Sequence, residues 1–118
     1  YTDAYSNLGV VLSEQGKFEE AIEQFRMALH LNPNLFLVHN NMATLLNQQG
    51  NIADAISHYQ QAITLYPKFA KAHNNLGSAL AGQGKLKEAI EYFENAININ
   101  PNYVDASNNL ETARLLSK

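Results

Sequence analysis

Three prolines, Pro33, Pro67 and Pro101, lie 34 residues apart in the sequence. Sliding the sequence by this period aligns it with itself, and eight columns hold the same residue in three successive copies. The identical columns are Asn7/Asn41/Asn75, Leu12/Leu46/Leu80, Gln15/Gln49/Gln83, Gly16/Gly50/Gly84, Ala21/Ala55/Ala89, Ile22/Ile56/Ile90, Ala28/Ala62/Ala96 and Pro33/Pro67/Pro101. A fixed period of this length is typical of repeat proteins, whose units fold by stacking on one another. The 118 residues therefore correspond to three units and about half of a fourth.

Each unit has the pattern of two helices joined by a tight turn. Tyr5, Leu8 and Leu12 are spaced as residues on one face of a helix. Gly16 favours the left-handed conformation that ends a helix. The apolar residues that follow continue the helical spacing up to Pro33, which ends the second helix because proline lacks an amide proton. We therefore expect an antiparallel helix pair in every unit.

Small residues are predicted to bring the two helices of a unit close together. Gly9 and Gly77, with Ala43 in the middle copy, are expected to let the first helix approach Ala21 and Ala89 of the second. One helix pair cannot bury its apolar face alone, so about three stacked units are needed for stability.

Residues 104–118 repeat only the beginning of a unit. Glu111 takes the place of Gly9 and Gly77, and Arg114 takes the place of Leu12 and Leu80. Large charged residues there predict a capping helix with a polar outer face, which ends the array. The other end shows no comparable cap and begins with tyrosine rather than methionine, so we expect the chain to be part of a longer one with further repeats before it.

The 34-residue helix–turn–helix unit has, in this order, Leu-Gly, Ala, an aromatic residue, Ala and Pro. This unit resembles the tetratricopeptide repeat. The resemblance covers residues 2–103 and, in part, 104–118. One departure is that the aromatic residue early in the first helix is present only as Tyr5, with His39, His73 and Ser107 in the matching places. The resemblance implies an all-α, right-handed solenoid forming a single domain, 1–118. Its expected parts are repeats 2–35, 36–69 and 70–103 and a C-terminal capping helix, 104–118.

Composition excludes several classes of partner. The net charge of −3 resides in residues 2–35, and no basic cluster is present, which disfavours nucleic acids and anionic membranes. No apolar run is long enough to span a membrane, and no signal peptide is visible. The absence of cysteine excludes disulfides and thiolate metal sites and fits a cytoplasmic location.

No arrangement of residues predicts catalysis. The four histidines include no His-x-x-x-His pair, and His39 and His73 are one repeat apart, too far to share a metal ion. Gly84 is the turn glycine of its repeat rather than part of a nucleotide-binding loop. The glutamates of the second helices fit solvated faces better than acid–base pairs. We therefore expect no enzyme, no metal and no cofactor.

The predicted function is binding of a protein or peptide partner in extended conformation. In tetratricopeptide repeats the first helices line a concave groove, and the resemblance places four rows of side chains there. The expected peptide-binding residues are the asparagine ladder Asn7, Asn41, Asn75 and Asn109, the neighbouring Asn40 and Asn74, and Leu37 and Lys71. An asparagine side chain both donates and accepts hydrogen bonds, so a ladder of them can pair with a peptide backbone without reading its side chains. The alternative is that these amides stabilise neighbouring helices.

Two subtypes of the family can be compared with the chain. Repeats that bind the acidic C-termini of heat-shock chaperones use a clamp of Lys, Asn, Asn, Lys and Arg, but here Ser6, Val10 and Asn75 occupy places that need Lys, Asn and Arg. The segments Ala4–Gly9 and Ala72–Gly77 are more similar to the repeats of O-linked N-acetylglucosamine transferases, in which a separate domain is catalytic.

Three roles stay open from the sequence. The chain is a stand-alone adaptor, a substrate-recruiting arm of a larger enzyme such as a glycosyltransferase, or a self-assembling structural element. We expect a monomer or weak end-to-end self-association.

Overall fold

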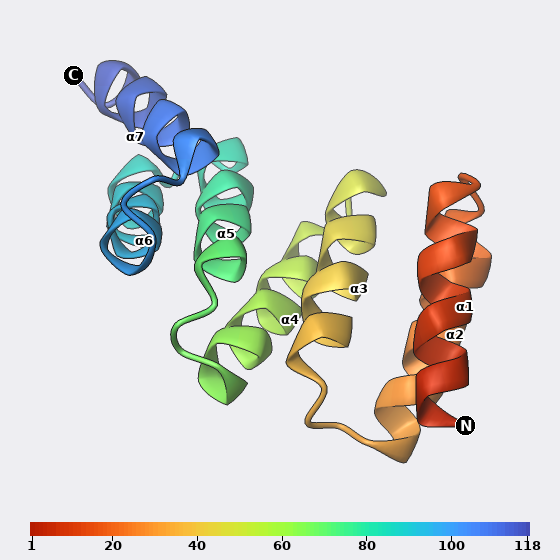
Figure 1. Ribbon diagram of the computed structural model, residues 1–118. Coiled ribbons are helices and arrows are strands. Elements are labelled where there is room, and N and C mark those ends of the chain that lie inside the picture. The colour runs from red at the N-terminus through yellow and green to blue at the C-terminus, as the bar shows by residue number, and fades with distance from the viewer. The chain divides into compact units, whose positions relative to one another are not determined.

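The computed structural model describes residues 1–118 and contains seven helices and no strand (Figure 1). The helices are α1 (Thr2–Glu14), α2 (Phe18–Leu31), α3 (Phe36–Gln48), α4 (Ile52–Leu65), α5 (Ala70–Gly82), α6 (Leu86–Ile99) and α7 (Val104–Leu116). Corresponding helices begin and end 34 residues apart, so the period of the sequence is also the period of the structure. The expected all-α helical repeat fold is confirmed. None of the helices is both long and apolar enough to cross a membrane.

The turn between the two helices of each repeat depends on its glycine. Gly16, Gly50 and Gly84 have φ angles of 77°, 83° and 80°, in the left-handed region where a side chain is disfavoured. After Gly16, the amide of Lys17 donates to the Leu12 carbonyl at 2.9 Å, which satisfies an acceptor at the end of α1.

The second helices end just before the prolines, and asparagine organises two of these ends. Asn32 follows α2, and its Oδ1 accepts a hydrogen bond from the Asn34 amide at 3.1 Å, across Pro33. Asn100 and Asn102 form the same turn after α6, at 3.2 Å. Asn32 and Asn100 therefore stabilise loops.

Aromatic rings of the second helices fill the space beside the small residues of the first. A Cβ atom added to Gly9 would lie 2.5 Å from Cε1 of Phe25, and one added to Gly77 would lie 2.6 Å from Cε1 of Phe93. Both rings are buried. The glycines thus make room for these rings. The sequence instead predicted that the glycines bring the first helix close to Ala21 and Ala89 of the second helix.

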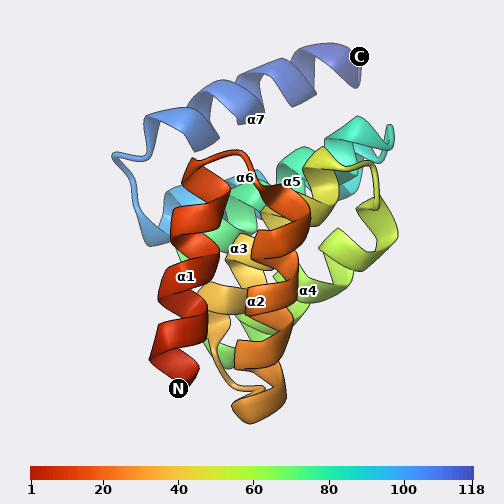
Figure 2. The ribbon, with the colours of Figure 1, turned by 90° about the vertical axis from the view of Figure 1, so that its right-hand side faces the viewer.

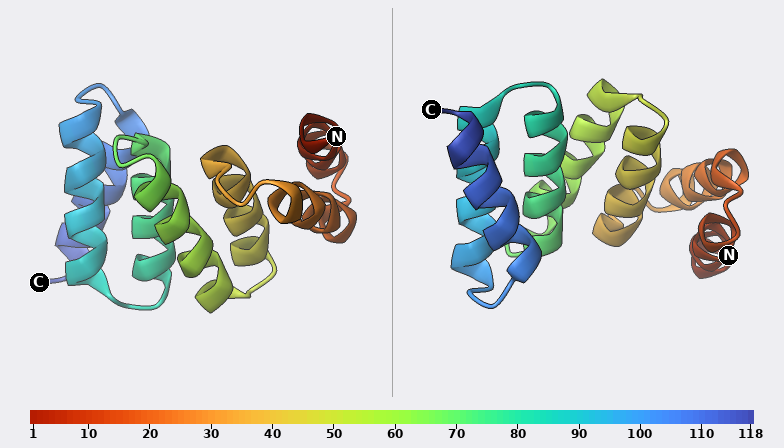
Figure 3. Two further views of the ribbon diagram at one scale, coloured as in Figure 1. Left: turned by 90° about the horizontal axis from the view of Figure 1, so that it is seen from below. Right: turned by 90° about the horizontal axis from the view of Figure 1, so that it is seen from above.

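The helices form two compact units, Tyr1–Leu65 with α1 to α4 and Tyr66–Lys118 with α5 to α7. In the first unit α1 packs on α2, α2 on α3 and α3 on α4, and α1 also touches α3 (Figure 2). In the second unit α5 packs on α6, and α7 packs on both (Figure 3). The assignment of 1–118 to a single domain stays a prediction.

The last helix, α7, buries one face and exposes the other. Leu110 is buried, as are the two alanines of the same stripe. Glu111 and Arg114 are exposed, as expected for a cap. The outer face is not polar throughout, however, because Leu115 and Leu116 are 61% and 67% exposed.

Candidate functional site

A pocket of about 360 Å³ lies in the first unit, between α1 and α3. Its polar lining residues are Asp3, Ser6 and Asn7 of α1, Asn34 of the α2–α3 loop and Asn41 of α3. Its apolar lining residues are Val10, Phe25, Leu35, Phe36, Leu37 and Val38. Three of the expected binding residues, Asn7, Leu37 and Asn41, therefore share one cavity.

The asparagines of this pocket have unused hydrogen-bonding capacity. Asn7 is exposed and Asn41 is half-buried, and the structure gives neither side-chain amide a hydrogen-bond partner within the protein. Each amide offers two donor hydrogens and an acceptor oxygen. Two such groups on adjacent first helices are able to pair with the amide groups of an extended chain.

Aliphatic side chains are exposed beside these amides. Leu37 is 55% exposed and Val10 is 38% exposed, and both line the pocket. At the position of Leu37, the following repeats have the charged residues Lys71 and Asp105. At the position of Val10, the later repeats have the hydroxyl residues Thr44 and Ser78. Only the α1–α3 pocket therefore combines aliphatic groups with amides at these positions.

In the second unit, the ladder residue Asn109 is occupied by contacts within the protein. Its Nδ2 donates to Oδ1 of Asn74 at 3.0 Å and to Oγ of Ser78 at 3.5 Å. Nδ2 of Asn74 in turn donates to the Tyr103 hydroxyl at 3.5 Å. These bonds join α7 to α5, which is the kind of contact that the sequence left open as the alternative role of Asn109.

The second row of asparagines is buried rather than presented to a ligand. Asn40 is 2% exposed and Asn74 is 6% exposed. Asn74 is buried because it pairs with the asparagine of the following first helix, as described above. The assignment of Asn40 and Asn74 to the peptide-binding residues stays a prediction, and both side chains would have to become accessible to contact a ligand.

The same arrangement explains why Asn41 is free. In the second unit, Asn109 bonds to Asn74, which lies 35 residues earlier in the sequence, that is, one repeat and one residue before it. The corresponding partner for Asn41 would be residue 6, which is Ser6, and no hydrogen bond joins the two side chains. The remaining expected residues, exposed Lys71 and half-buried Asn75, lie on α5 in the second unit.

A pair of histidines in the first unit was missed by the sequence analysis. Nδ1 of His39, on α3, lies 2.9 Å from Nδ1 of His58, on α4, with the rings stacked 5.2 Å apart between centroids. Nε2 of His39 lies 2.8 Å from the Pro33 carbonyl oxygen. A comparison across the two helices of one repeat could have found the pair, but only His39 and His73 were compared.

Burial lowers the pKa of His58 below its ordinary value of 6.5. The adjacent His39 lowers this pKa further, Asp54 on α4 opposes the shift, and Arg26 on α2 adds to it.

His73 occupies the position of His39 in the next repeat, in different surroundings. Its Nε2 lies 2.8 Å from the Pro67 carbonyl oxygen, as in the first unit. Its neighbour on the second helix is Tyr92, with ring centroids 5.9 Å apart, and its buried Nδ1 has no hydrogen-bond partner. The second and third repeats therefore fill this position with different pairs of side chains, His39 with His58 and His73 with Tyr92.

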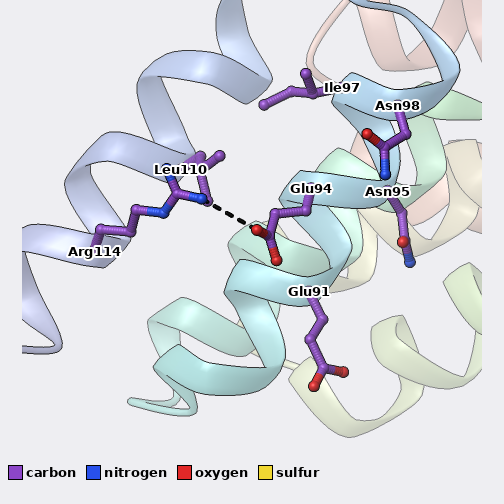
Figure 4. A pocket seen from close by; sticks show the side chains of 7 residues that line it. All are labelled: Glu91, Glu94, Asn95, Ile97, Asn98, Leu110 and Arg114. Atoms are coloured by element: carbon purple, nitrogen blue, oxygen red, sulfur yellow. Dashed lines mark hydrogen bonds and ion pairs between the residues drawn. The ribbon is translucent and has the colours of Figure 1, made fainter.

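A larger pocket, of about 570 Å³, lies between α6 and α7 (Figure 4). Arg114 donates to Oε2 of Glu94 at 3.1 Å across it, and both side chains are about half exposed. Glu91 lines the same pocket. No group of three or more His, Cys, Asp or Glu residues in the chain is arranged to hold a metal ion.

Comparisons with known proteins agree with this architecture. Two family models described as tetratricopeptide repeat match residues 2–35 and 40–104. The chain belongs to the tetratricopeptide-repeat family. As a member of this family it is a protein-interaction scaffold and not an enzyme. A sequence search of curated proteins found no match.

Solved structures, two of them of other tetratricopeptide-repeat domains, are similar in fold. The first such domain of Spaghetti (RPAP3), solved with the HSP90 peptide SRMEEVD, has a TM-score of 0.94 and 25% identity, covering 99% of this chain and 94% of that one. The Sgt2 domain from Aspergillus fumigatus has a TM-score of 0.90 and 24% identity, covering 96% and 76%. MamA has a TM-score of 0.92 and 24% identity, covering 96% and 66%.

Proposed function

We propose that this tetratricopeptide-repeat chain binds an extended peptide segment of a protein partner in the pocket between α1 and α3. The observation that carries the proposal is the pair of unpartnered amides, Asn7 and Asn41, beside the exposed side chains of Leu37 and Val10. The amides hold the peptide backbone, and the aliphatic groups receive an apolar side chain.

The backbone contacts make binding tolerant of sequence, because every peptide bond offers the same donor and acceptor. Each hydrogen bond contributes about 0.5–1.5 kcal/mol net. The partner segment loses conformational entropy when it becomes ordered, so the affinity is modest.

The chemistry of the pocket also indicates which peptides it does not favour. The Spaghetti domain was solved with a peptide that ends in acidic residues. Here Ser6 and Val10 line the pocket, and no lysine or arginine does. An acidic C-terminus would find none of the cations that make carboxylate hydrogen bonds strong.

Asn75 and Lys71, on α5, are proposed as a separate set of peptide contacts in the second unit. The support for this assignment is that both residues lie on α5, with Lys71 exposed and Asn75 half-buried. Asn109, whose amide bonds to Asn74, belongs to the same proposed set.

The test is selection of nine-residue peptides from a displayed random library, followed by fluorescence anisotropy with the selected, labelled peptide. The double variant Asn7→Ala/Asn41→Ala should weaken binding about 30-fold, which corresponds to two hydrogen bonds of average strength. Asn95→Ala, an exposed asparagine on α6, is the matched control and should bind as the wild type does. Unchanged affinity of the double variant, with its helicity retained, would contradict the proposal.

A further inference from the structure

One charged side chain, that of Asp3, lines the pocket between α1 and α3. The other lining residues are serine, asparagine, phenylalanine and aliphatic residues, none of which carries a charge. Asp3 is exposed, and its carboxylate forms no hydrogen bond and no ion pair within the protein. A ligand in the pocket therefore meets an unpaired negative charge.

The surroundings of the pocket strengthen this negative charge. The net charge of −3 resides in residues 2–35, which supply most of the pocket wall. No lysine or arginine lines the pocket, and the one ion pair of the chain, Arg114 with Glu94, lies in the second unit. A cleft of one sign raises the local concentration of ligands of the opposite sign. The pocket therefore attracts cationic groups.

The carboxylate and an aliphatic side chain are placed one repeat apart. Asp3 on α1 and Leu37 on α3 hold the same position in successive repeats, and both line the pocket. Neighbouring helices lie about 10 Å apart between their axes. In an extended peptide, residues i and i+2 point to the same side and are about 7 Å apart, a gap that the long stem of a lysine extends. One peptide can therefore contact both side chains.

The second unit does not have this combination. There the same column holds Lys71 on α5 and Asp105 on α7, which are two charged residues with no aliphatic one. Asp3 and Asp105 both lie in the first turn of a helix, where a negative charge interacts favourably with the helix dipole. A role in helix stability is therefore common to both residues, whereas only Asp3 lines the pocket with the unpartnered amides.

We propose that the α1–α3 pocket selects peptides that carry a lysine or arginine two residues away from an aliphatic side chain. Asp3 is the residue that determines this specificity, because its carboxylate pairs with the cation. Leu37 and Val10 contact the aliphatic side chain. The inference rests on the proposed function, since it names the class of peptide that enters the same pocket. The amides of Asn7 and Asn41 hold any peptide backbone, and Asp3 adds a preference among peptides.

The experiment is an NMR titration with three defined peptides. The first is Ser-Lys-Ser-Leu-Ser-Lys-Ser, which offers a lysine two residues from the leucine in either chain direction. The second has glutamine in place of both lysines, and the third has glutamate. Acetyl and amide caps remove the terminal charges. The side-chain ¹H–¹⁵N signals of Asn7 and Asn41 report binding in the pocket.

The lysine peptide should bind about threefold more tightly than the glutamine peptide at low salt, which is within the range of exposed ion pairs. The glutamate peptide should bind more weakly than the glutamine peptide. The difference between the three should shrink in high salt, because salt screens exposed charges.

Three variants locate the preference. Asp3→Asn should bind the lysine and glutamine peptides equally, with its affinity for the glutamine peptide unchanged. Asp105→Asn, in the same column and also in the first turn of its helix, should keep the preference. Glu23→Gln, at an exposed position on α2, makes the same change of charge in the first repeat and should keep it as well.

The outcomes separate this inference from the proposed function. Equal affinities of the wild type for the lysine and glutamine peptides, or a preference that survives in Asp3→Asn, would overturn the inference and leave the proposed function standing. If none of the three peptides shifts the signals of Asn7 and Asn41, the proposed function fails and the inference fails with it.

Discussion

Gly77 and Gly82 lie on the same helix, α5, in opposite surroundings. A Cβ atom at Gly77 would meet Phe93 at 2.6 Å, whereas one at Gly82 would have nothing within 4 Å. Gly77→Ala should therefore destabilise the protein by about 1–3 kcal/mol of overpacking, offset by at most about 1 kcal/mol of helix propensity. Gly82→Ala should gain up to about 1 kcal/mol, because only the propensity changes.

Urea denaturation of the two variants measures this difference. The midpoint of Gly77→Ala should lie below that of the wild type, and the midpoint of Gly82→Ala at or above it. A Gly77→Ala protein as stable as Gly82→Ala would show that the Phe93 ring moves aside at no cost.

At the scale of the element, α7 depends on burial and not on its ion pair. Leu110 is 8% exposed, while the side chains of Arg114 and Glu94 are 57% and 45% exposed. Leu110→Ala should cost about 2–4 kcal/mol, the usual range for a buried leucine. Arg114→Ala should cost less than about 1 kcal/mol, because exposed ion pairs contribute little.

Both α7 variants can be compared by urea denaturation at two salt concentrations. The small effect of Arg114→Ala should shrink further in high salt, which screens exposed charges. An Arg114→Ala variant as unstable as Leu110→Ala would mean that the ion pair, rather than the apolar face, attaches the helix.

At the scale of the whole molecule, we expect a mutation to destabilise its own repeat and the adjacent one more than distant repeats. Within each compact unit, helices pack only on helices of the same or the adjacent repeat. Repeat proteins of this kind have stabilities that are approximately sums over units and their neighbours. Leu110→Ala should therefore increase amide hydrogen exchange in α5, α6 and α7 more than in α1 and α2.

Hydrogen exchange followed by mass spectrometry resolves these segments. The wild-type protein at the same temperature and pH is the reference for each peptide. An equal increase in α1 and α7 would mean that the chain unfolds in a single cooperative step, against the local model.

Much of the fold was determined by the sequence alone. The 34-residue period, the three turn glycines and the three prolines predicted every helix pair, because the backbone conformation at Gly16 and the end of a helix before Pro33 are local properties. The exposure of Glu111 and Arg114 was predicted for a similar reason, because a charged side chain at a packing position disfavours burial. That α7 caps the array stays a prediction.

The tertiary structure decided which side chains of the ladder are free. Asn109 and Asn41 are equivalent in the repeat, but Asn109 bonds to Asn74 across the helix interface, whereas the position equivalent to Asn74 for Asn41 holds the shorter Ser6. The pairing of His39 with His58 likewise depends on how two helices cross. Such contacts depend on distances between residues far apart in the chain, and the periodicity of a sequence specifies helices and their order but not the atoms that meet between them.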